Sequence, residues 1–397
     1  MNYDLLFAII FYGILYLLFL KYRSRFDIQG KIFVMLRTKI GLKLMDNIAK
    51  RCPRLLKYLG YFGILICFIG MGFIFYYLIK GTLDLMFKPD VIPILSPVLP
   101  GVEVPGLPIV MSFWHWIIGI LIVAGIHEFS HGLYARLARI KIKSSGIAFL
   151  GPILAAFVEP DEKEMKNISV RKQLSIMMGG PFSNFLSGAV FFLILILILD
   201  PLAGNMVEYN GVKIISINEE LPINSSGLKI GDEITYIDNY PIFNQKDFVS
   251  VLDTKKPGDV IEVETLDGFN EVELVARERN QSEALMGLSV TYSSIDIKDG
   301  KNKILAYILL WLVELFFWLY VISFGIGLFN LLPLGPLDGG RMFMIVIKNY
   351  IKQENIGNII IKTMTWFCLV LIFINLLPFI WKLLNWLLGG IVFIFGI

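Results

Sequence analysis

Long runs of apolar residues dominate the chain, and this pattern predicts a multi-pass α-helical membrane protein with about six spans. A helix needs about 20 residues to cross the hydrocarbon core of a bilayer. A further apolar segment, Leu383–Ile397, is short and either spans or lies in the interface. The predicted spans are Leu5–Leu20, Leu59–Ile79, Phe113–Leu137, Leu174–Leu199, Ile304–Leu332 and Met364–Ile380.

The charged residues between the spans predict how the chain crosses the membrane. Residues 21–57 carry eleven Lys or Arg against Asp27 and Asp46, and cytoplasmic loops are the ones that carry such an excess. We therefore expect this loop inside the cell and the N-terminus outside. No basic residue precedes the first span, so we expect it to be retained and not removed as a secretory signal. The proline-rich residues 80–108 would then form an external connection that is not helical throughout.

Composition narrows the kind of metal site that the chain can build. Hydrophobic residues make up 56% of the chain and charged residues 17%, which is typical of membrane proteins. The net charge of +3 gives no sign of a nucleic-acid partner, and we expect none. Cys52, Cys67 and Cys368 are scattered, so neither a disulfide framework nor a thiolate metal site is expected. A metal site must use histidine and carboxylate, and the chain has only three histidines.

Two of these histidines lie four residues apart in the third predicted span. On a helix His127 and His131 face the same way, and the Glu128 carboxylate can reach a water at the metal without being a ligand. Such a pentapeptide also arises by chance, but an ionisable group at membrane depth costs about 2.5–3.5 kcal/mol. One zinc ion per chain would offset that cost, so the motif predicts metal-assisted hydrolysis. His115, near the other end of the span, is expected to be interfacial.

The end of the fifth predicted span offers a third ligand. Residues 333–340 contain two prolines and three glycines, which must unwind the helix. We expect an unwound strand that carries Asp338 at the depth of the histidines. The alternative is a turn in which Asp338 caps the two glycines that follow it. If Asp338 is not a ligand, Glu159 and Asp161 are the next candidates.

The segment Gly146–Val158 is apolar but too short to cross the bilayer as a helix, and Gly151-Pro152 interrupts it. We expect a re-entrant β hairpin here, with an interfacial turn as the alternative. In the fourth span, Gly180 and Gly188 would let helices approach closely. Asn184 in the same span is expected either to bond a neighbouring helix or to hold a substrate backbone.

Residues 205–303 have the composition of a soluble domain. Together with Ser226-Gly227-Leu228 before Gly231-Asp232, the element order resembles a circularly permuted PDZ domain of the type found in proteases. The resemblance implies a carboxylate-binding loop in which Gly287 and Leu288 hold the end of a peptide; the alternative is a small β domain without ligand affinity. The expected elements are strands at Val212–Ile217, Glu233–Ile237, Val260–Thr265 and Val272–Ala276 and a capped helix at Asn244–Leu252.

Three motifs, in this order, resemble those of the site-2 proteases, a family of intramembrane zinc metalloproteases: His127–His131, Gly180–Asn184 and Asn330–Gly340. The predicted hairpin is similar to the family's membrane-embedded hairpin, and the inserted domain to its PDZ-bearing branch. The resemblance implies that His127, His131 and Asp338 bind zinc and that Glu128 is the general base and then the proton donor. We also expect Asn330, like Asn184, to contact the substrate.

The depth of the site implies single-span membrane proteins as substrates. A membrane helix must unwind to expose its carbonyls, and the edge of a hairpin would hold the unwound strand. The resemblance implies that substrates are trimmed outside before the cut that releases a cytoplasmic fragment. A zinc-binding membrane scaffold with a PDZ domain would not need Glu128. A zinc transporter would need a polar relay, which we do not expect in the outer halves of the third and fifth spans.

The expected organisation is a cell-membrane protein with its active site toward the cytoplasm and its PDZ-like domain outside. No particular oligomeric state is indicated. The expected regions are two N-terminal spans (1–110), catalytic spans with the hairpin (111–204), the PDZ-like domain (205–303), and a catalytic span with C-terminal spans (304–397).

Overall fold

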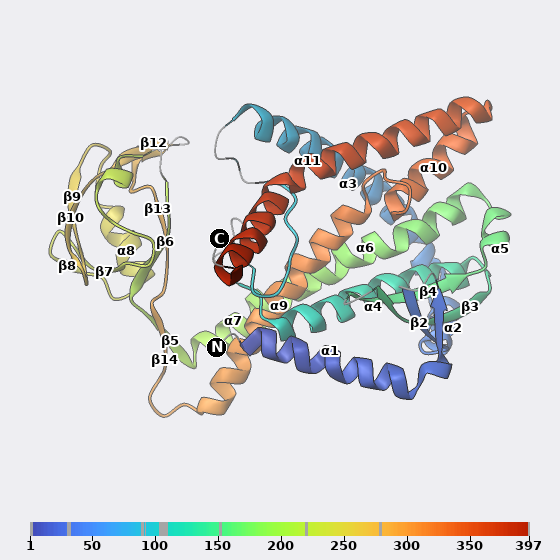
Figure 1. The fold of residues 1–397 in the computed structure, drawn as a ribbon, viewed down its shortest axis with the longest axis horizontal. Coiled ribbons are helices and arrows are strands. Elements are labelled where there is room, and N and C mark those ends of the chain that lie inside the picture. Colours follow the sequence, from blue (N-terminus) through green and yellow to red (C-terminus); the bar gives the residue numbers. More distant parts are fainter. Residues whose placement is uncertain are drawn as a thin grey trace. The chain divides into compact units, whose positions relative to one another are not determined.

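The chain folds into two compact units, a helical unit of residues 1–195 and 314–397 and a β-rich unit of residues 196–313. Figure 1 shows the long helices of the first unit and the strands of the second. The structure is a computed structural model, and it describes residues 3–29, 33–88, 91, 93–102, 110–150, 153–218, 221–277 and 280–395.

Six helices among the described residues are long and apolar enough to cross a membrane, which confirms the predicted number of spans. α6 continues through a π-helical turn, Leu195–Leu199, into the short α7, Asp200–Gly204. The last apolar segment is not a separate helix, because α11 runs without interruption to Phe395. The six helices are α1 Tyr3–Lys21, α3 Pro53–Phe87, α4 Phe113–Leu137, α6 Val170–Ile194, α9 Lys303–Asn330 and α11 Glu354–Phe395.

Glycines let these helices approach closely, as predicted for the fourth span. A Cβ added at Gly188 of α6 would lie 2.7 Å from the Phe324 ring of α9. A Cβ added at Gly63 of α3 would lie 2.5 Å from Met178 Sδ of α6. Both distances are far below van der Waals contact, so the packing of α6 against its neighbours requires positions without a side chain.

A four-stranded antiparallel sheet lies in the helical unit, with the strand order β1-β2-β3-β4. The predicted hairpin segment forms β3, Ile142–Leu150, and β4, Ile153–Pro160, paired antiparallel; its Gly151-Pro152 turn lies outside the described residues, and its insertion into the membrane stays a prediction. β1, Phe26–Gln29, and β2, Phe33–Thr38, extend the hairpin through β2–β3 pairing. The basic loop of residues 21–57 is therefore more than a connection, since it also forms the helix α2, Leu42–Arg51.

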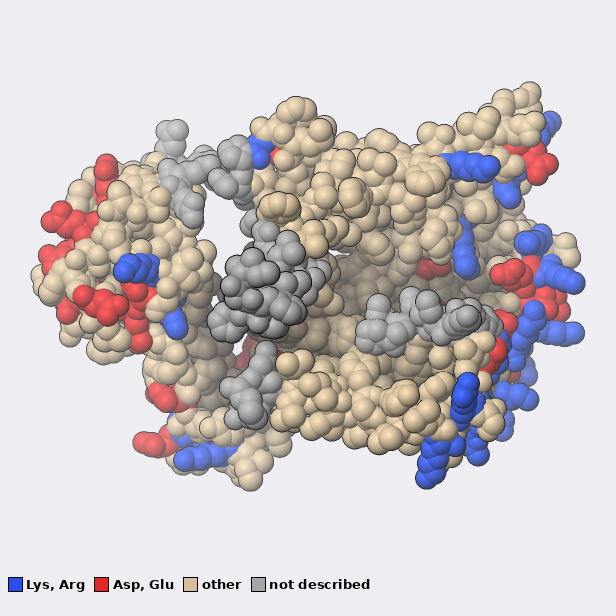
Figure 2. Space-filling model, in the orientation of Figure 1, with Lys and Arg blue, Asp and Glu red and all other residues tan. Residues whose placement is uncertain are grey.

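Basic side chains gather at one end of the helical unit. On the face shown in Figure 2, Lys and Arg crowd the end where the short helix α5, Glu162–Lys166, connects β4 to α6. Most of the remaining surface of the helices on this face carries no charge, as expected of lipid-facing helices. The direction in which the chain crosses the membrane stays a prediction.

The β-rich unit contains the strands that the sequence predicts. The predicted strands at 212–217, 233–237 and 260–265 are observed as β6, β7 and β9. The predicted helix is α8, Gln245–Leu252, and the Asn244 side chain caps it by accepting hydrogen bonds from the N–H groups of Lys246 and Asp247. The fourth predicted strand is divided into β10, Gly268–Glu273, and β11, Val275–Arg277. The main sheet has the order β10-β9-β7-β6-β13, where β13 is Leu288–Thr291, and β8, Tyr240–Pro241, pairs with β7. Outside it, β5, Val207–Asn210, pairs with β14, Ser294–Ile297, and β11 pairs with β12, Asn280–Leu285.

His115 is buried inside the helical unit, and its expected position at the level of the membrane interface stays a prediction. Only 2% of it is exposed, and its Nδ1 lies 2.7 Å from Ser112 Oγ and 3.3 Å from a carboxylate oxygen of Glu314 in α9. His115 and Glu314 form a single polar contact and not a relay across the membrane, so the expectation that these outer halves lack such a relay stays a prediction. Burial between two helices favours such pairing, because a polar side chain in an apolar setting needs a hydrogen-bond partner.

Candidate active site

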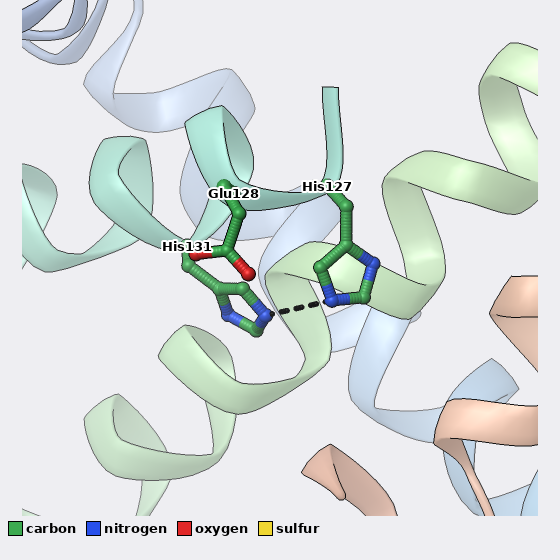
Figure 3. A group of neighbouring side chains, drawn as sticks. All are labelled: His127, Glu128 and His131. Carbon is green, nitrogen blue, oxygen red and sulfur yellow. Dashed lines mark hydrogen bonds between the residues drawn. The ribbon is translucent and has the colours of Figure 1, made fainter. Parts of the chain in front are cut away.

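The histidine pair lies on α4 inside the helical unit. His127 and His131 are one helical turn apart and only 7% and 8% exposed, and their Nε2 atoms are 3.2 Å apart. Figure 3 shows both imidazoles and the Glu128 carboxylate directed toward the same space. Ligand atoms of the three residues lie within 4.8 Å of one another. The predicted clustering on one helix face is observed.

Asp338 reaches the histidines from a segment more than two hundred residues later. Its Oδ2 lies 3.0 Å from His127 Nε2 and 3.2 Å from His131 Nε2. The helix α10 spans Asp338–Tyr350. Residues 331–337, between α9 and α10, are unwound, as their prolines and glycines predict. The expected unwound strand at Asp338 itself is wrong, because this residue begins α10.

The two glycines after Asp338 allow this placement. A Cβ added at Gly339 would lie 2.2 Å from the carbonyl oxygen of Leu331, and one at Gly340 would lie 2.0 Å from that of Leu334. The first turn of α10 thus rests directly on the backbone of the unwound segment. Neither position tolerates a side chain without displacing the backbone that sets the place of Asp338.

One face of α6 covers the histidines from the other side. The carbonyl of Ile176 lies 2.7 Å from His131 Nδ1. Four residues later, a Cβ added at Gly180 would lie 2.4 Å from both Nε2 atoms. Four residues further, Asn184 Nδ2 lies 3.1 Å from His127 Nδ1. The spacing of one helical turn places all three α6 residues on the face that meets α4.

These contacts decide which nitrogen of each imidazole is free. His131 donates its Nδ1–H to the Ile176 carbonyl, so in the neutral imidazole Nε2 carries the lone pair that a metal would bind. His127 needs a hydrogen-bond acceptor at Nδ1 to do the same. Asn184 is completely buried and its Oδ1 has no partner among the described residues. Because amide oxygen and nitrogen are interchangeable by a simple flip, Oδ1 can accept from His127 Nδ1–H.

A cavity of about 810 Å³ gives access to the site. Glu128 lines it, and its Oε2 accepts a hydrogen bond of 3.1 Å from Val158 N–H of β4. Asn330, the last residue of α9, also lines the cavity. Asn184 does not line it, so of the two asparagines expected to contact substrate the structure brings only Asn330 to the open space.

A polar cluster joins three strands, and two of its members, Arg37 and Glu159, line this cavity. Arg37 of β2, Ser144 of β3 and Glu159 of β4 are hydrogen-bonded to one another. Burial alone would raise the pKa of Glu159, but the hydrogen bonds from Ser144 and Arg37 hold it below its ordinary value. Glu159 is thus engaged elsewhere, and Asp161 caps α5, so neither replaces Asp338. No sequence pattern singled out Arg37, because it stands among many other basic residues.

The residues expected to hold a peptide end lie in the β-rich unit. Gly287 has a left-handed φ of +84°, and its carbonyl accepts a hydrogen bond of 2.8 Å from Asn218 N–H. Leu288 begins β13, Leu288–Thr291, and lines a groove of about 180 Å³ with Phe248 and Leu252 of α8. The groove between an edge strand and a helix is suited to an extended peptide.

The donor set of the helical unit fits a zinc ion. Two imidazole nitrogens and one carboxylate oxygen are ligands that zinc accepts, and three protein ligands leave a position open in catalytic sites. Gly180 leaves space beside both Nε2 atoms that a methyl group would fill. Hydrogen bonds to the far ring nitrogens, as at Ile176, fix ligating histidines in metal sites.

Comparison with known proteins gives sequence relatives across most of the chain. The chain is 31% identical over 318 residues to an uncharacterized protein of Methanocaldococcus jannaschii, which covers 78% of this chain and 76% of that one. It is 23% identical over 246 residues to a Streptococcus pyogenes serotype M6 protein provisionally named as a zinc metalloprotease. The matched residues cover 50% of this chain and 57% of that protein.

Solved structures match a smaller part. The PDZ domain of the SdrC-like protein of Listeria monocytogenes is 24% identical, with 21% of this chain and 90% of that chain covered and a TM-score of 0.19.

A sequence model described as Peptidase family M50 matches residues 115–371, more than half of the chain. This match includes the histidine pair, Glu128 and Asp338, and the chain belongs to peptidase family M50.

Proposed function

We propose that the chain is an intramembrane zinc metalloprotease that cuts peptide bonds within or near the membrane-spanning helices of other proteins. The observation that carries the proposal is the convergence of His127 Nε2, His131 Nε2 and Asp338 Oδ2, at 3.0 to 3.2 Å from one another, inside a bundle of membrane-length helices. Family membership supports a membrane metalloprotease. The substrate class is inferred from the place of the site.

Each side chain has a distinct task in this proposal. His127, His131 and Asp338 would hold the zinc ion. A bound zinc ion supplies Lewis acidity, which polarises a carbonyl and lowers the pKa of a water to about 7. Glu128 accepts the proton of the attacking water and then gives it to the departing amine. The hydrogen bond from Val158 N–H keeps the Glu128 carboxylate directed toward the cavity.

The strand β4 would hold the substrate beside Glu128. β4 is an edge of its sheet, and the Val158 N–H points away from β3 toward Glu128. Because successive residues of a strand face opposite sides, Ala156 also presents its backbone groups on that side. A substrate helix must unwind to be cut, and adding as a strand to this edge would replace its lost helical hydrogen bonds.

The β-rich unit would select substrates rather than cut them. We propose that the groove between α8 and β13 takes the newly formed end of a substrate that another protease has trimmed outside the membrane. Left-handed Gly287 and the start of β13 provide backbone groups for a terminal carboxylate. None of the candidate zinc ligands comes from this unit.

The competing function is a zinc-binding membrane scaffold that does not hydrolyse peptides. Such a scaffold has no use for a carboxylate that is hydrogen-bonded to an edge strand and lies within 4.8 Å of the two histidines. Glu128 therefore favours the enzyme.

Metal analysis combined with cleavage tests the proposal. The full chain in lipid vesicles should contain one zinc ion and cut a single-span test protein, and a chelator should stop the cut until zinc is returned. Asp338→Ala should lose both zinc and cleavage, because it removes one of three ligands. A zinc-loaded parent chain that leaves several single-span proteins intact, or full zinc in Asp338→Ala, would refute the assignment.

A further inference from the structure

A second cavity, of about 310 Å³, lies in the helical unit, and neither His127 nor His131 lines it. It is formed where α3 and α6 begin and α4 ends, and we call it the basic pocket. Lys57, Arg171 and Lys172 line it, and no acidic residue does. None of these three side chains makes an ion pair with a described residue. A pocket with this much unpaired positive charge is suited to an anion.

The hydroxyl of a mostly buried tyrosine also lies beside this space. Tyr134 of α4 lines the basic pocket and is only 6% exposed. Its hydroxyl makes no hydrogen bond with any residue that the structure describes. This oxygen is accessible from the basic pocket, so a bound ligand can reach it. An oxygen of a bound ligand would satisfy it, which points to an acceptor-rich group such as phosphate.

Apolar and aromatic side chains form another part of the wall of the basic pocket, beside Ser169 and Ser175. Leu56 and Leu137 line it, and Tyr61 of α3 lines it while 54% exposed. A soluble phosphate compound would gain nothing from these walls, whereas the glycerol and first acyl carbons of a lipid would bury apolar surface there. The pocket also lies at the ends of membrane-length helices, the level at which lipid headgroups lie.

We propose that the basic pocket binds the phosphate headgroup of an anionic phospholipid. Lys57, Arg171 and Lys172 neutralise the phosphate, and the Tyr134 hydroxyl donates to one of its oxygens. The apolar walls hold the start of the acyl chains. Basic pockets between membrane helices bind anionic headgroups by this combination of charge and apolar contact.

Such a lipid would lie close to the candidate active site. Tyr134 follows His131 by three residues on α4, and Ser175, which lines the basic pocket, precedes the Ile176 whose carbonyl accepts from His131. A Cβ added at Gly179 of α6 would lie 3.1 Å from the Tyr134 ring. The lipid would therefore brace the contact between α4 and α6 on which the histidines depend.

Native mass spectrometry of the purified full chain tests the proposal. After incubation with micelles that contain phosphatidylglycerol or phosphatidylcholine at equal mole fraction, the parent chain should retain phosphatidylglycerol and lose phosphatidylcholine. Changing Lys57, Arg171 and Lys172 together to Gln should abolish retention, since each cation removed weakens it about fivefold. Tyr134→Phe, which keeps the ring and removes only the donor, should weaken retention by a smaller factor.

A matched variant controls for general surface charge. Lys348, Lys352 and Lys362 are exposed and lie outside the basic pocket, so changing all three to Gln removes the same charge and should leave retention unchanged. Equal retention by the Lys57, Arg171 and Lys172 variant, or equal loss in the control, would overturn the proposal. Release of the lipid by inorganic phosphate at millimolar concentration would also overturn it and assign the pocket to a soluble phosphate. Unfolding temperature and helix content measured in parallel show that each variant is folded.

Discussion

Two edge strands in this protein lie beside a helix, and they differ in what the helix presents to them. At β4, the Val158 N–H donates to the carboxylate of Glu128 on α4. At β13, the Val290 carbonyl accepts a hydrogen bond of 3.1 Å from the Gln245 amide on α8. Both edges can accept an extended peptide by the same backbone pairing. Only the first places that peptide next to an ionisable group and to candidate metal ligands, so binding and cutting use one kind of edge with different neighbours.

Removal of the ionisable group at the first edge should have the largest effect. Glu128→Gln is nearly isosteric and keeps both histidines and Asp338, so zinc content should stay at the parental level. Cleavage of a single-span substrate should fall by about 10²- to 10⁴-fold, the range that general acid–base catalysis contributes. Parallel zinc analysis and cleavage assays check this. Cleavage at the parental rate would remove Glu128 from the mechanism.

Asn184 should come next, because it acts on the metal through His127. Asn184→Asp keeps an oxygen that accepts from Nδ1–H, whereas Asn184→Leu leaves that nitrogen without an acceptor. Zinc affinity, measured by competition with a chelator, should fall about 10- to 100-fold in the Leu variant, as is usual when the partner of a ligating histidine is lost. The Asp variant should keep most of the affinity. Equal loss in both variants would mean that Asn184 only fills space.

The edge of β4 can be blocked without touching the metal. Ala156→Pro removes an N–H on the side that faces Glu128 and leaves the pairing with β3 formed by its neighbours. One lost hydrogen bond is worth about 0.5–1.5 kcal/mol, so cleavage should fall up to about tenfold with zinc unchanged. Ala156→Val keeps the N–H and serves as the control. Full activity in the proline variant would exclude strand addition at this edge.

The second edge should be dispensable for the cut itself. β5 and β14 are partners, with Asn210 opposite Ser294, so residues 211–293 can be replaced by an Asn-Gly turn that closes this hairpin. The shortened chain should cut a short, pre-trimmed substrate at the parental rate and discriminate less against the untrimmed form. Rates for the two substrates, compared in parent and variant, give the answer. Loss of cleavage by a zinc-loaded, folded variant would contradict the division of tasks.

The smallest effect should come from the polar cluster that joins β4 to β2. The pKa of Glu159 is held low in the folded chain, so this contact contributes stability above the ordinary carboxyl range and loses it as the pH falls through the folded pKa. Because Glu159 and Arg37 are both about one-third exposed, the contribution should be below about 1 kcal/mol. Glu159→Gln should flatten the decline in unfolding temperature between about pH 7 and pH 3. An identical decline in parent and variant would show that the contact adds no stability.

Sequence patterns predicted the parts of the fold that are governed by nearby residues. α4 has the predicted ends because Ser112 caps an apolar run, and β6, β7 and β9 have the predicted ends because turn residues flank them. The pairing of β2 with β3 was not predicted, since it joins segments more than a hundred residues apart. Asn184 shows the same limit within the site. Its type indicated a buried amide, but only the packing of α6 on α4 shows that it faces His127 and not the cavity.

The face of α6 formed by Ile176, Gly180 and Asn184 has a meaning for how such sites change over time. At the first position only a backbone carbonyl is used, so its side chain is free to drift among apolar types. The second position admits no side chain, and the third must keep an oxygen. A distant relative whose overall similarity has faded should therefore still show a glycine followed, four residues on, by an oxygen-bearing side chain on the helix that covers its histidine pair. That spacing can be searched for in chains with no other recognisable likeness.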